Sequence, residues 1–138
     1  MRLTGFSDLS FRVLLFTATK QDKLVTIDEM NEFYSVSRGH LMKVVNALTR
    51  SGYLESIRGR SGGLRLARPP EDINLAAVLR VTEADFSLVE CMRAGNTCKL
   101  SPMCRLKSPL NEAMTAFMET LGKYTLEDII LQEYAFAP

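Results

Sequence analysis

The sequence has one histidine, three cysteines and no long apolar run, and each scarcity excludes a class of protein. The single histidine, His40, has no neighbouring partner with which to build a catalytic triad or a histidine-based metal site. No stretch approaches the roughly 20 apolar residues of a membrane-spanning helix. The glycine-rich segment RGRSGG lies between two expected strands, so it is not a nucleotide-binding loop, which precedes a helix. We therefore expect neither an enzyme nor a membrane protein.

The first twenty residues also lack the features of a secretory signal. Their apolar run is interrupted by Asp8 and Arg12, and no small-residue cleavage site follows it. We expect a cytoplasmic protein, in which thiols stay reduced, so a structural disulfide is disfavoured. The 138 residues are enough for one domain with a hydrophobic core of its own.

The positive charge of the chain is concentrated in one band. The formal net charge is only +1. Residues 1–37 carry four Lys/Arg against five Asp/Glu, and residues 66–138 carry seven against ten. Residues 38–65 carry six Lys/Arg against Glu55 alone, a net +5. A basic band in an otherwise mildly acidic chain indicates a local surface for a polyanion.

Apolar periodicity predicts helices in the first third of the chain. Residues 7–19 have apolar side chains at helical spacing, with Ser7 or Asp8 as the expected N-cap. A second, short helix is expected at about 27–34, because Thr26 just before it and Glu29 in its first turn fit a capping box.

The clearest helix of the sequence follows Ser37, its expected N-cap. Gly52 stands where the glycine that ends a helix belongs. An apolar stripe recurs at helical spacing and consists of Leu41, Val44, Val45 and Leu48. The residues off this stripe are expected to face outward: Arg38, His40, Lys43, Asn46 and Arg50.

Two short strands are expected on either side of the glycine-rich segment, in the stretch YLESIRGRSGGLRLARPP. They predict a hairpin that ends at the two prolines. Further helices are expected at about 75–83, at about 108–124, and from Thr125, which would cap the last of them. The cysteine stretch between them has no clear period, so we expect a loop with at most one helical turn.

A short helix, a turn, a longer helix with a polar outer face and a basic hairpin predict, in this order, a winged helix-turn-helix that binds DNA. An α-helix fits the major groove, and side chains near its N-terminus reach base edges. The candidate DNA-binding residues are Ser37, Arg38, Gly39, His40 and Lys43 of the helix and Arg58, Arg60 and Ser61 of the wing. Two other interpretations are an RNA-binding winged helix, although an aromatic stacking platform is lacking, and a surface whose charges serve only solvation.

All three cysteines lie within residues 91–104, in the pattern C-x6-C-x5-C. This spacing differs from the C-x2-C pairs of zinc ribbons and from the close-set ferredoxin run. Three thiolates on one loop can bind one soft metal centre and leave one position for another ligand. Four basic residues would offset the negative charge of such a centre: Arg93, Lys99, Arg105 and Lys107. Zinc, free thiols and a redox switch stay open as alternatives.

The chain resembles the iron–sulfur winged-helix regulators, the family that also contains the cluster-biosynthesis regulator IscR. The resemblance covers nearly the whole chain and is carried by MRLTGFSDLSFRVL, by VSRGHLMKVVNALTRSGYLESIRGRSGGLRLARPPEDI and by SPMCRLK. Three cysteines followed by RLK are typical of the nitric-oxide-sensing branch of this family. The IscR branch has a histidine ligand where Lys107 stands here.

The resemblance implies that Cys91, Cys98 and Cys104 hold an iron–sulfur cluster, of the 4Fe–4S type or, as the alternative, 2Fe–2S. It also implies that Asp8 of the partner subunit is the fourth ligand. The first spacer, six residues long, is slightly longer than is usual in the family. The amphipathic helix from about 108 then serves a homodimer, which matches the two-fold symmetry common among operators.

These expectations combine into a function and a division of the chain. Residues 1–83 form the winged helix-turn-helix domain, 84–107 the cluster-binding loop, and 108–138 the dimerisation helix and a C-terminal helix. We predict a dimeric, cytoplasmic repressor whose cluster senses nitric oxide and controls affinity for a double-stranded DNA operator. The alternatives are a regulator of general redox or iron status, and a zinc- or thiol-based interaction module without gas sensing.

Overall fold

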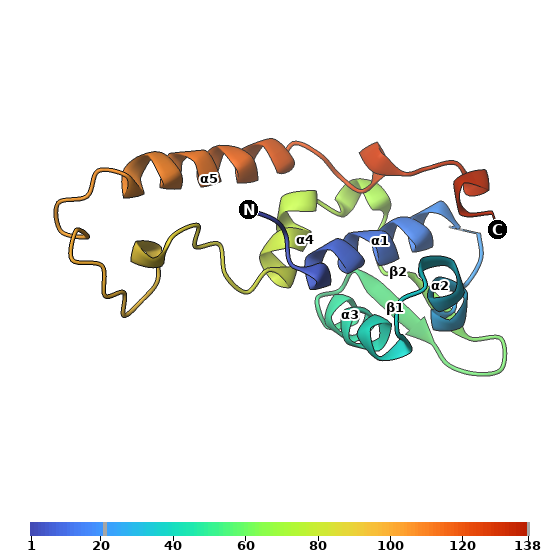
Figure 1. Cartoon of the computed structure of the whole chain (residues 1–138). Coiled ribbons are helices and arrows are strands. Elements are labelled where there is room, and N and C mark those ends of the chain that lie inside the picture. Colours follow the sequence, from blue (N-terminus) through green and yellow to red (C-terminus); the bar gives the residue numbers. More distant parts are fainter. Residues whose placement is uncertain (21, 138) are drawn as a thin grey trace.

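The computed structural model describes residues 1–20 and 22–137, in which helices surround one antiparallel hairpin (Figure 1). The helices are α1 (Gly5–Thr19), α2 (Ile27–Tyr34), α3 (Arg38–Arg50), α4 (Leu75–Thr82) and α5 (Lys107–Leu121), and the strands are β1 (Leu54–Ile57) and β2 (Gly63–Leu66). This confirms the predicted mainly helical fold with a β-hairpin wing. None of the helices in these residues combines the length and apolar composition needed to cross a bilayer.

The ends of α2 and α3 follow the sequence prediction. The Glu29 carboxylate accepts a hydrogen bond from the Thr26 N–H at 2.6 Å, and the Thr26 hydroxyl accepts one from the Glu29 N–H at 3.2 Å. Ser37 caps α3 by accepting from the His40 N–H at 3.3 Å. After α3, Gly52 has a φ of +75°, a left-handed conformation that glycine adopts without steric cost. The turn between α2 and α3 is therefore encoded locally.

The N-cap of α1 differs from the prediction. Thr4, rather than Ser7 or Asp8, caps the helix by accepting a hydrogen bond from the Ser7 N–H at 3.2 Å. Ser7 is fully buried, and its hydroxyl donates to the Thr82 hydroxyl of α4 at 2.9 Å. The helix starts earlier because Ser7 lies on the face that packs against α4, where it cannot act as a cap.

Helix α1 lies at the centre of the body and holds α3 and the hairpin in place (Figure 1). Its Val13 and Leu14 are completely buried, as are the apolar residues of the α3 stripe to within a few per cent. The chain just before α2 pairs with β2, because Val25 and Leu64 exchange backbone hydrogen bonds of 2.7 and 3.0 Å. The helix-turn-helix and the hairpin therefore share one core.

The helix predicted from Thr125 onward is not formed. The chain instead makes two short 3-10 turns, Glu127–Ile129 and Glu133–Phe136. The Asp128 carboxylate accepts from the Thr125 N–H at 2.7 Å and from its hydroxyl at 3.1 Å, which closes a tight local turn. The Phe136 ring then packs edge-on against Phe16 of α1, with centroids 5.4 Å apart. Packing against the body decides the path of this segment.

The stretch from Glu83 to Thr125, which contains the cysteines and α5, has no buried residue. In Figure 1 the cysteine loop lies far from the body, and α5 runs back toward it above the N-terminus and α4. The C-terminal end of this stretch is tied to α4: the Asn74 amide donates to the Gly122 carbonyl at 2.7 Å, and the Leu75 N–H donates to the Tyr124 carbonyl at 3.1 Å. The rest of the stretch contributes no buried side chain to the core.

Candidate DNA-binding face and cysteine segment

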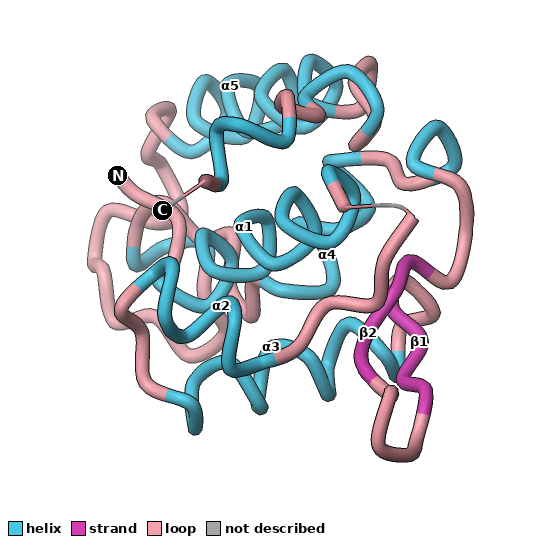
Figure 2. Tube along the Cα trace, turned by 90° about the vertical axis from the view of Figure 1, so that its right-hand side faces the viewer, coloured by secondary structure: helices cyan, strands magenta, loops and turns pink. Residues whose placement is uncertain are grey.

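Helix α3 and the hairpin lie on one side of the molecule, and α5 lies on the opposite side (Figure 1, Figure 2). In Figure 2 the tip of the hairpin projects below the helical body beside α3. The strands pair antiparallel, with Leu54 opposite Leu66 and Ile57 opposite Gly63. The helix and the adjoining wing are thus presented on the same side of the molecule, accessible to one duplex.

The candidate residues at the start of α3 are all exposed, and two of them also have contacts within the protein. The Ser37 hydroxyl is the N-cap of the helix. Arg38 forms an ion pair with Asp28 of α2, although both side chains are more than half exposed. A Cβ added at Gly39 would meet no atom within 4 Å, so the protein leaves open space at this point of the face.

The wing carries its candidate residues at the tip, where Arg58, Arg60 and Ser61 are exposed. Neither arginine, nor Lys43 of α3, forms an ion pair within the part of the chain that the structure describes. Arg65 does so, because it stands directly opposite Glu55 in the hairpin, at 2.9 Å. The positive charges at the tip and on the outer face of α3 are therefore available to an external anion.

Gly62 closes the tip of the wing, and we expect Gly62→Ala to displace it. A methyl group there would collide with the backbone oxygens of Ile57 and Gly59. We expect DNA affinity to fall roughly tenfold, as for the loss of the wing's phosphate contacts, while the helical content stays unchanged. Gly5→Ala is the control, because its added Cβ meets nothing within 4 Å. Fluorescence anisotropy with a labelled duplex measures both, and equal affinities would contradict the role of the wing.

Two residues of this face were not among the sequence candidates. Met42 is 41% exposed, and Asn46, which the periodicity predicted to face outward, is exposed as well. Both lie on the side of α3 away from the buried stripe that contains Leu41 and Val44. The period of 3.6 residues is the signal for both, although the apolar character of Met42 does not by itself indicate a groove residue.

The three cysteines lie in the segment between α4 and α5, each partly exposed and each with a free thiol. Cys91 is within the 3-10 turn Glu90–Met92, the single turn that the sequence predicted. Thr97 donates to the Glu90 carboxylate from its N–H and its hydroxyl, both at 2.9 Å. These bonds hold the pKa of Glu90 below its usual value and draw together the two ends of the first spacer.

The chemistry of these residues fits an iron–sulfur cluster, but their present arrangement does not surround one. Three cysteines on one loop are the ligand type that such clusters use. Within residues 1–20 and 22–137, no three His, Cys, Asp or Glu side chains are gathered as a metal site. Because the segment has no buried residue, it can gather the thiols without disturbing the core.

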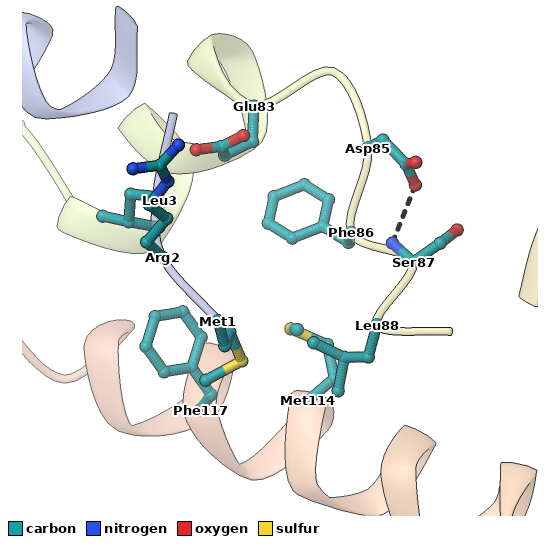
Figure 3. Close-up of a pocket in the computed structure, with 10 residues that line it drawn as sticks. All are labelled: Met1, Arg2, Leu3, Glu83, Asp85, Phe86, Ser87, Leu88, Met114 and Phe117. Atoms are coloured by element: carbon teal, nitrogen blue, oxygen red, sulfur yellow. Dashed lines mark hydrogen bonds between the residues drawn. The ribbon is translucent and has the colours of Figure 1, made fainter. Parts of the chain in front are cut away.

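A cavity of about 410 Å³ lies beneath the residues that lead from α4 to the cysteines (Figure 3). The apolar side chains around it come from the N-terminus, this connection and α5, and include Met1, Phe86, Leu88, Met114 and Phe117. At its edge, the Glu83 carboxylate accepts from the Thr4 N–H at 2.6 Å. The connection between α4 and the cysteines therefore borders a cavity, and its first residue, Glu83, is hydrogen-bonded to Thr4, the N-cap of α1.

Asp8 lies in the first turn of α1, where its carboxylate pairs with Arg12 at 2.8 Å, both side chains being about half exposed. It borders a second cavity, of about 430 Å³, together with His40 and Lys43 at the start of α3. The Tyr34 hydroxyl of α2 donates to the Arg12 carbonyl at 3.0 Å, and the Arg12 guanidinium lies 5.9 Å from the Tyr34 ring centre. Burial raises the pKa of Tyr34 to about 12, which keeps this hydroxyl protonated.

These contacts connect Asp8 with both helices of the helix-turn-helix. The sequence did not single out Arg12 as a partner of Asp8, although the i, i+4 spacing in an expected helix was a signal for it.

Sequence comparison finds a protein family and individual proteins that are similar to nearly the whole chain. A family model described as Rrf2, iron-dependent transcriptional regulator, matches residues 3–132. The HTH-type transcriptional regulator NsrR of Bacillus licheniformis is 50% identical over 135 residues, which cover 96% of this chain and 94% of that protein. NsrR of Bacillus subtilis strain 168 is 50% identical over 132 residues, which cover 94% of this chain and 90% of that protein.

Solved structures of lower identity share the fold. CymR, the global cysteine regulator of B. subtilis, superposes with a TM-score of 0.75 at 22% identity, covering 94% of this chain and 95% of its own. T. potens IscR gives a TM-score of 0.73 at 20% identity, covering 99% and 97%. These likenesses confirm the winged-helix fold with its C-terminal extension.

Proposed function

The chain belongs to the Rrf2 family of transcriptional regulators, which are not enzymes, and from this premise we propose that it is a repressor whose iron–sulfur cluster senses nitric oxide. In this proposal it acts in the cytoplasm as a homodimer, and the state of the cluster controls its affinity for a double-stranded DNA operator. Residues 1–83 read the operator, 84–107 hold the cluster, and 108–138 provide the dimer contact.

Exposed cations on one face support the DNA-binding part of the proposal. Lys43 lies on the outer face of α3, and Arg58 and Arg60 lie at the tip of the wing beside it. Because phosphate contacts supply much of the affinity for DNA, unpaired cations spaced over a helix and a wing suit a duplex. Ser37, Gly39 and His40 at the start of α3 are then positioned for the bases or the adjacent backbone.

The observation that carries the proposal is the absence of any buried residue from Glu83 to Thr125, a stretch that contains all three cysteines and α5. A helix of 15 residues is marginally stable on its own in water, so α5 needs a surface to pack against. Its apolar stripe consists of Leu110, Met114, Phe117, Met118 and Leu121, which this chain covers only in part, and a second copy would cover the rest. A cluster would in turn fix the loop by gathering Cys91, Cys98 and Cys104.

The fourth ligand in this proposal is Asp8 of the partner subunit. When bound, the cluster supplies the iron with which nitric oxide reacts. A carboxylate is a harder and weaker partner for iron than a thiolate, so this position is the expected point of attack.

The contacts of Asp8 supply a path from the cluster to the DNA-binding face. Arg12, the ion-pair partner of Asp8, also contacts Tyr34 of α2. Asp8 and Arg12 border the same cavity as His40 and Lys43 of α3. Asp8 would hold the cluster through its carboxylate, the same group that pairs with Arg12 here beside the start of the DNA-reading helix.

Anaerobic purification tests the proposed function. We expect a brown protein with visible absorption, containing iron and acid-labile sulfide in equal amounts. Zinc without sulfide would instead indicate the zinc- or thiol-based interaction module. A cluster that nitric oxide leaves intact, with DNA affinity that follows oxidation or iron supply, would indicate a regulator of general redox or iron status.

Asp8→Asn should retain the fold and the three-cysteine ligation but change the reactivity of the cluster. The amide is a weaker iron ligand than the carboxylate, so we expect a shifted visible spectrum and an altered rate of reaction with nitric oxide, measured by stopped-flow absorbance. Loss of the half-exposed ion pair alone costs at most about 0.5 kcal/mol.

Arg12→Gln is the matched control, because it removes the same ion pair and keeps the carboxylate. If Asp8→Asn has the spectrum and kinetics of the wild type, Asp8 is not a ligand, and Glu90 becomes the next candidate.

A further inference from the structure

We infer that Met42 and Asn46 of α3 select A·T base pairs in the operator, Met42 by packing on a thymine methyl group and Asn46 by hydrogen bonding to adenine. The inference rests on the proposed DNA-binding function and deepens it by assigning sequence selection to two residues. The cations of the same face contact phosphates, which every sequence carries, so they position the protein without choosing a site.

Met42 is an exposed apolar residue in a helix whose other large aliphatic residues are buried. Its side chain is 41% exposed, whereas Leu41, Val44 and Leu48 are exposed by 1% or less. A flexible, polarisable thioether adapts well to irregular apolar surfaces. In the major groove, the apolar group that a base pair offers is the C5-methyl of thymine. Met42 therefore has the chemistry to distinguish thymine from cytosine.

Asn46 is exposed in the middle of α3, where asparagine is a poorer helix former than alanine or leucine. Two other asparagines have structural roles: the amide of Asn31 donates to the Val36 carbonyl at 2.6 Å, and that of Asn74 to the Gly122 carbonyl at 2.7 Å. Asn46 lies instead on the open face. An asparagine amide can bond simultaneously to N6 and N7 of adenine, which makes it a specific reader of that base.

The positions of the two residues suit a joint role. They are four residues apart, so their Cβ atoms lie about 5–6 Å from each other along one side of the helix. Base pairs stack at about 3.4 Å, so the two side chains reach the same base pair or neighbouring ones. The open space at Gly39, three residues before Met42, allows the helix to approach the groove floor closely. Lys43 and Arg50 lie near them on the same helix, and both are exposed and available to contact phosphates.

Selection from a pool of duplexes with a randomised centre tests the inference and also supplies the operator sequence. The wild type, Met42→Ala, Asn46→Ala and Lys43→Ala proteins are each used to enrich sequences, under anaerobic conditions with the cluster present. The thymines of the wild-type consensus are then replaced one at a time by deoxyuridine, which lacks only the methyl group. Fluorescence anisotropy gives the affinity of each protein for each duplex, and circular dichroism confirms that each variant is folded.

We expect one thymine in each half of the operator at which deoxyuridine weakens wild-type binding about fourfold, the effect of one methyl group. The same replacement should not change the affinity of Met42→Ala. Asn46→Ala should lose about tenfold or more in preference for adenine at the same or the adjacent pair. Lys43→Ala should weaken binding to all sequences and keep the wild-type consensus.

If Met42→Ala and Asn46→Ala retain the wild-type consensus and every deoxyuridine effect, the inference is wrong, although DNA binding stands. If the wild type enriches no sequence, the proposed function fails.

Discussion

Replacing Cys98 by alanine is expected to abolish retention of the iron–sulfur cluster while leaving a folded protein. A cluster held by three cysteines and one carboxylate cannot spare a thiolate, because the carboxylate is already the weaker ligand. We expect iron and sulfide in the purified variant to fall to the background level, and the same for Cys91→Ala and Cys104→Ala. Operator affinity should change by about tenfold to a hundredfold, the usual size of coupling between two sites.

The fold should survive these replacements because no cysteine is part of the core. All three thiols are partly exposed, and the whole stretch from Glu83 to Thr125 has no buried residue. Met103→Ala is the matched control, since Met103 neighbours Cys104 in the same loop and is 80% exposed. It should retain iron and sulfide as the wild type does. Full iron and sulfide in all three cysteine variants would refute the ligand assignment.

The second large effect is expected from the wing. Arg58→Ala combined with Arg60→Ala should weaken binding to all DNA sequences, because both side chains are exposed at the tip and neither is paired within the described residues. Each lost phosphate contact lowers the slope of log affinity against log salt by about 0.9. Because the proposed homodimer has two wings, the double variant removes four arginines, and we expect it to lose roughly 3.6 units of slope, with the largest loss of affinity at low salt.

Arg80→Ala is the control for a general effect of charge. Arg80 is exposed on α4 and borders α5, on the other side of the body from the wing. Its removal lowers the net charge by one unit but should leave the salt slope unchanged. A titration of a labelled operator at several salt concentrations measures all three proteins, and an unchanged slope in the wing variant would show that its arginines do not contact phosphate.

The parts of the fold that the sequence predicted well are those whose signals are local. The capping box at Thr26 and Glu29, the cap at Ser37 and the left-handed Gly52 each depend on residues within one helical turn, and the structure confirms all of them. The buried stripe of α3 follows from its period. The two failures depend on distant residues.

At the start of α1, Thr4, Ser7 and Asp8 were all chemically able to cap the helix, and burial of Ser7 against Thr82 decided between them. After Thr125, a capping signal was present, but the chain forms short turns there and Phe136 packs on Phe16. Neither contact is visible in the local sequence.

The candidate site likewise contains features with a local sequence signal and features without one. Exposure of Lys43, Arg58 and Arg60 followed from the helical period and the hairpin. The Asp8–Arg12 pair has a local signal in its i, i+4 spacing, whereas the Arg38–Asp28 pair depends on how α2 and α3 meet. The cysteine spacing predicts a soft-metal ligand set, and both the ligand set and its assembly stay predictions. A loop without buried residues takes its final shape from what it binds.

The most direct test of the account is the affinity of the anaerobically purified protein for its selected operator, followed by anisotropy during titration with nitric oxide. The account predicts tight binding by the cluster-containing protein. It also predicts release of DNA in step with the loss of visible absorption, with affinity falling at least about tenfold. Affinity that stays constant while nitric oxide destroys the cluster would contradict it.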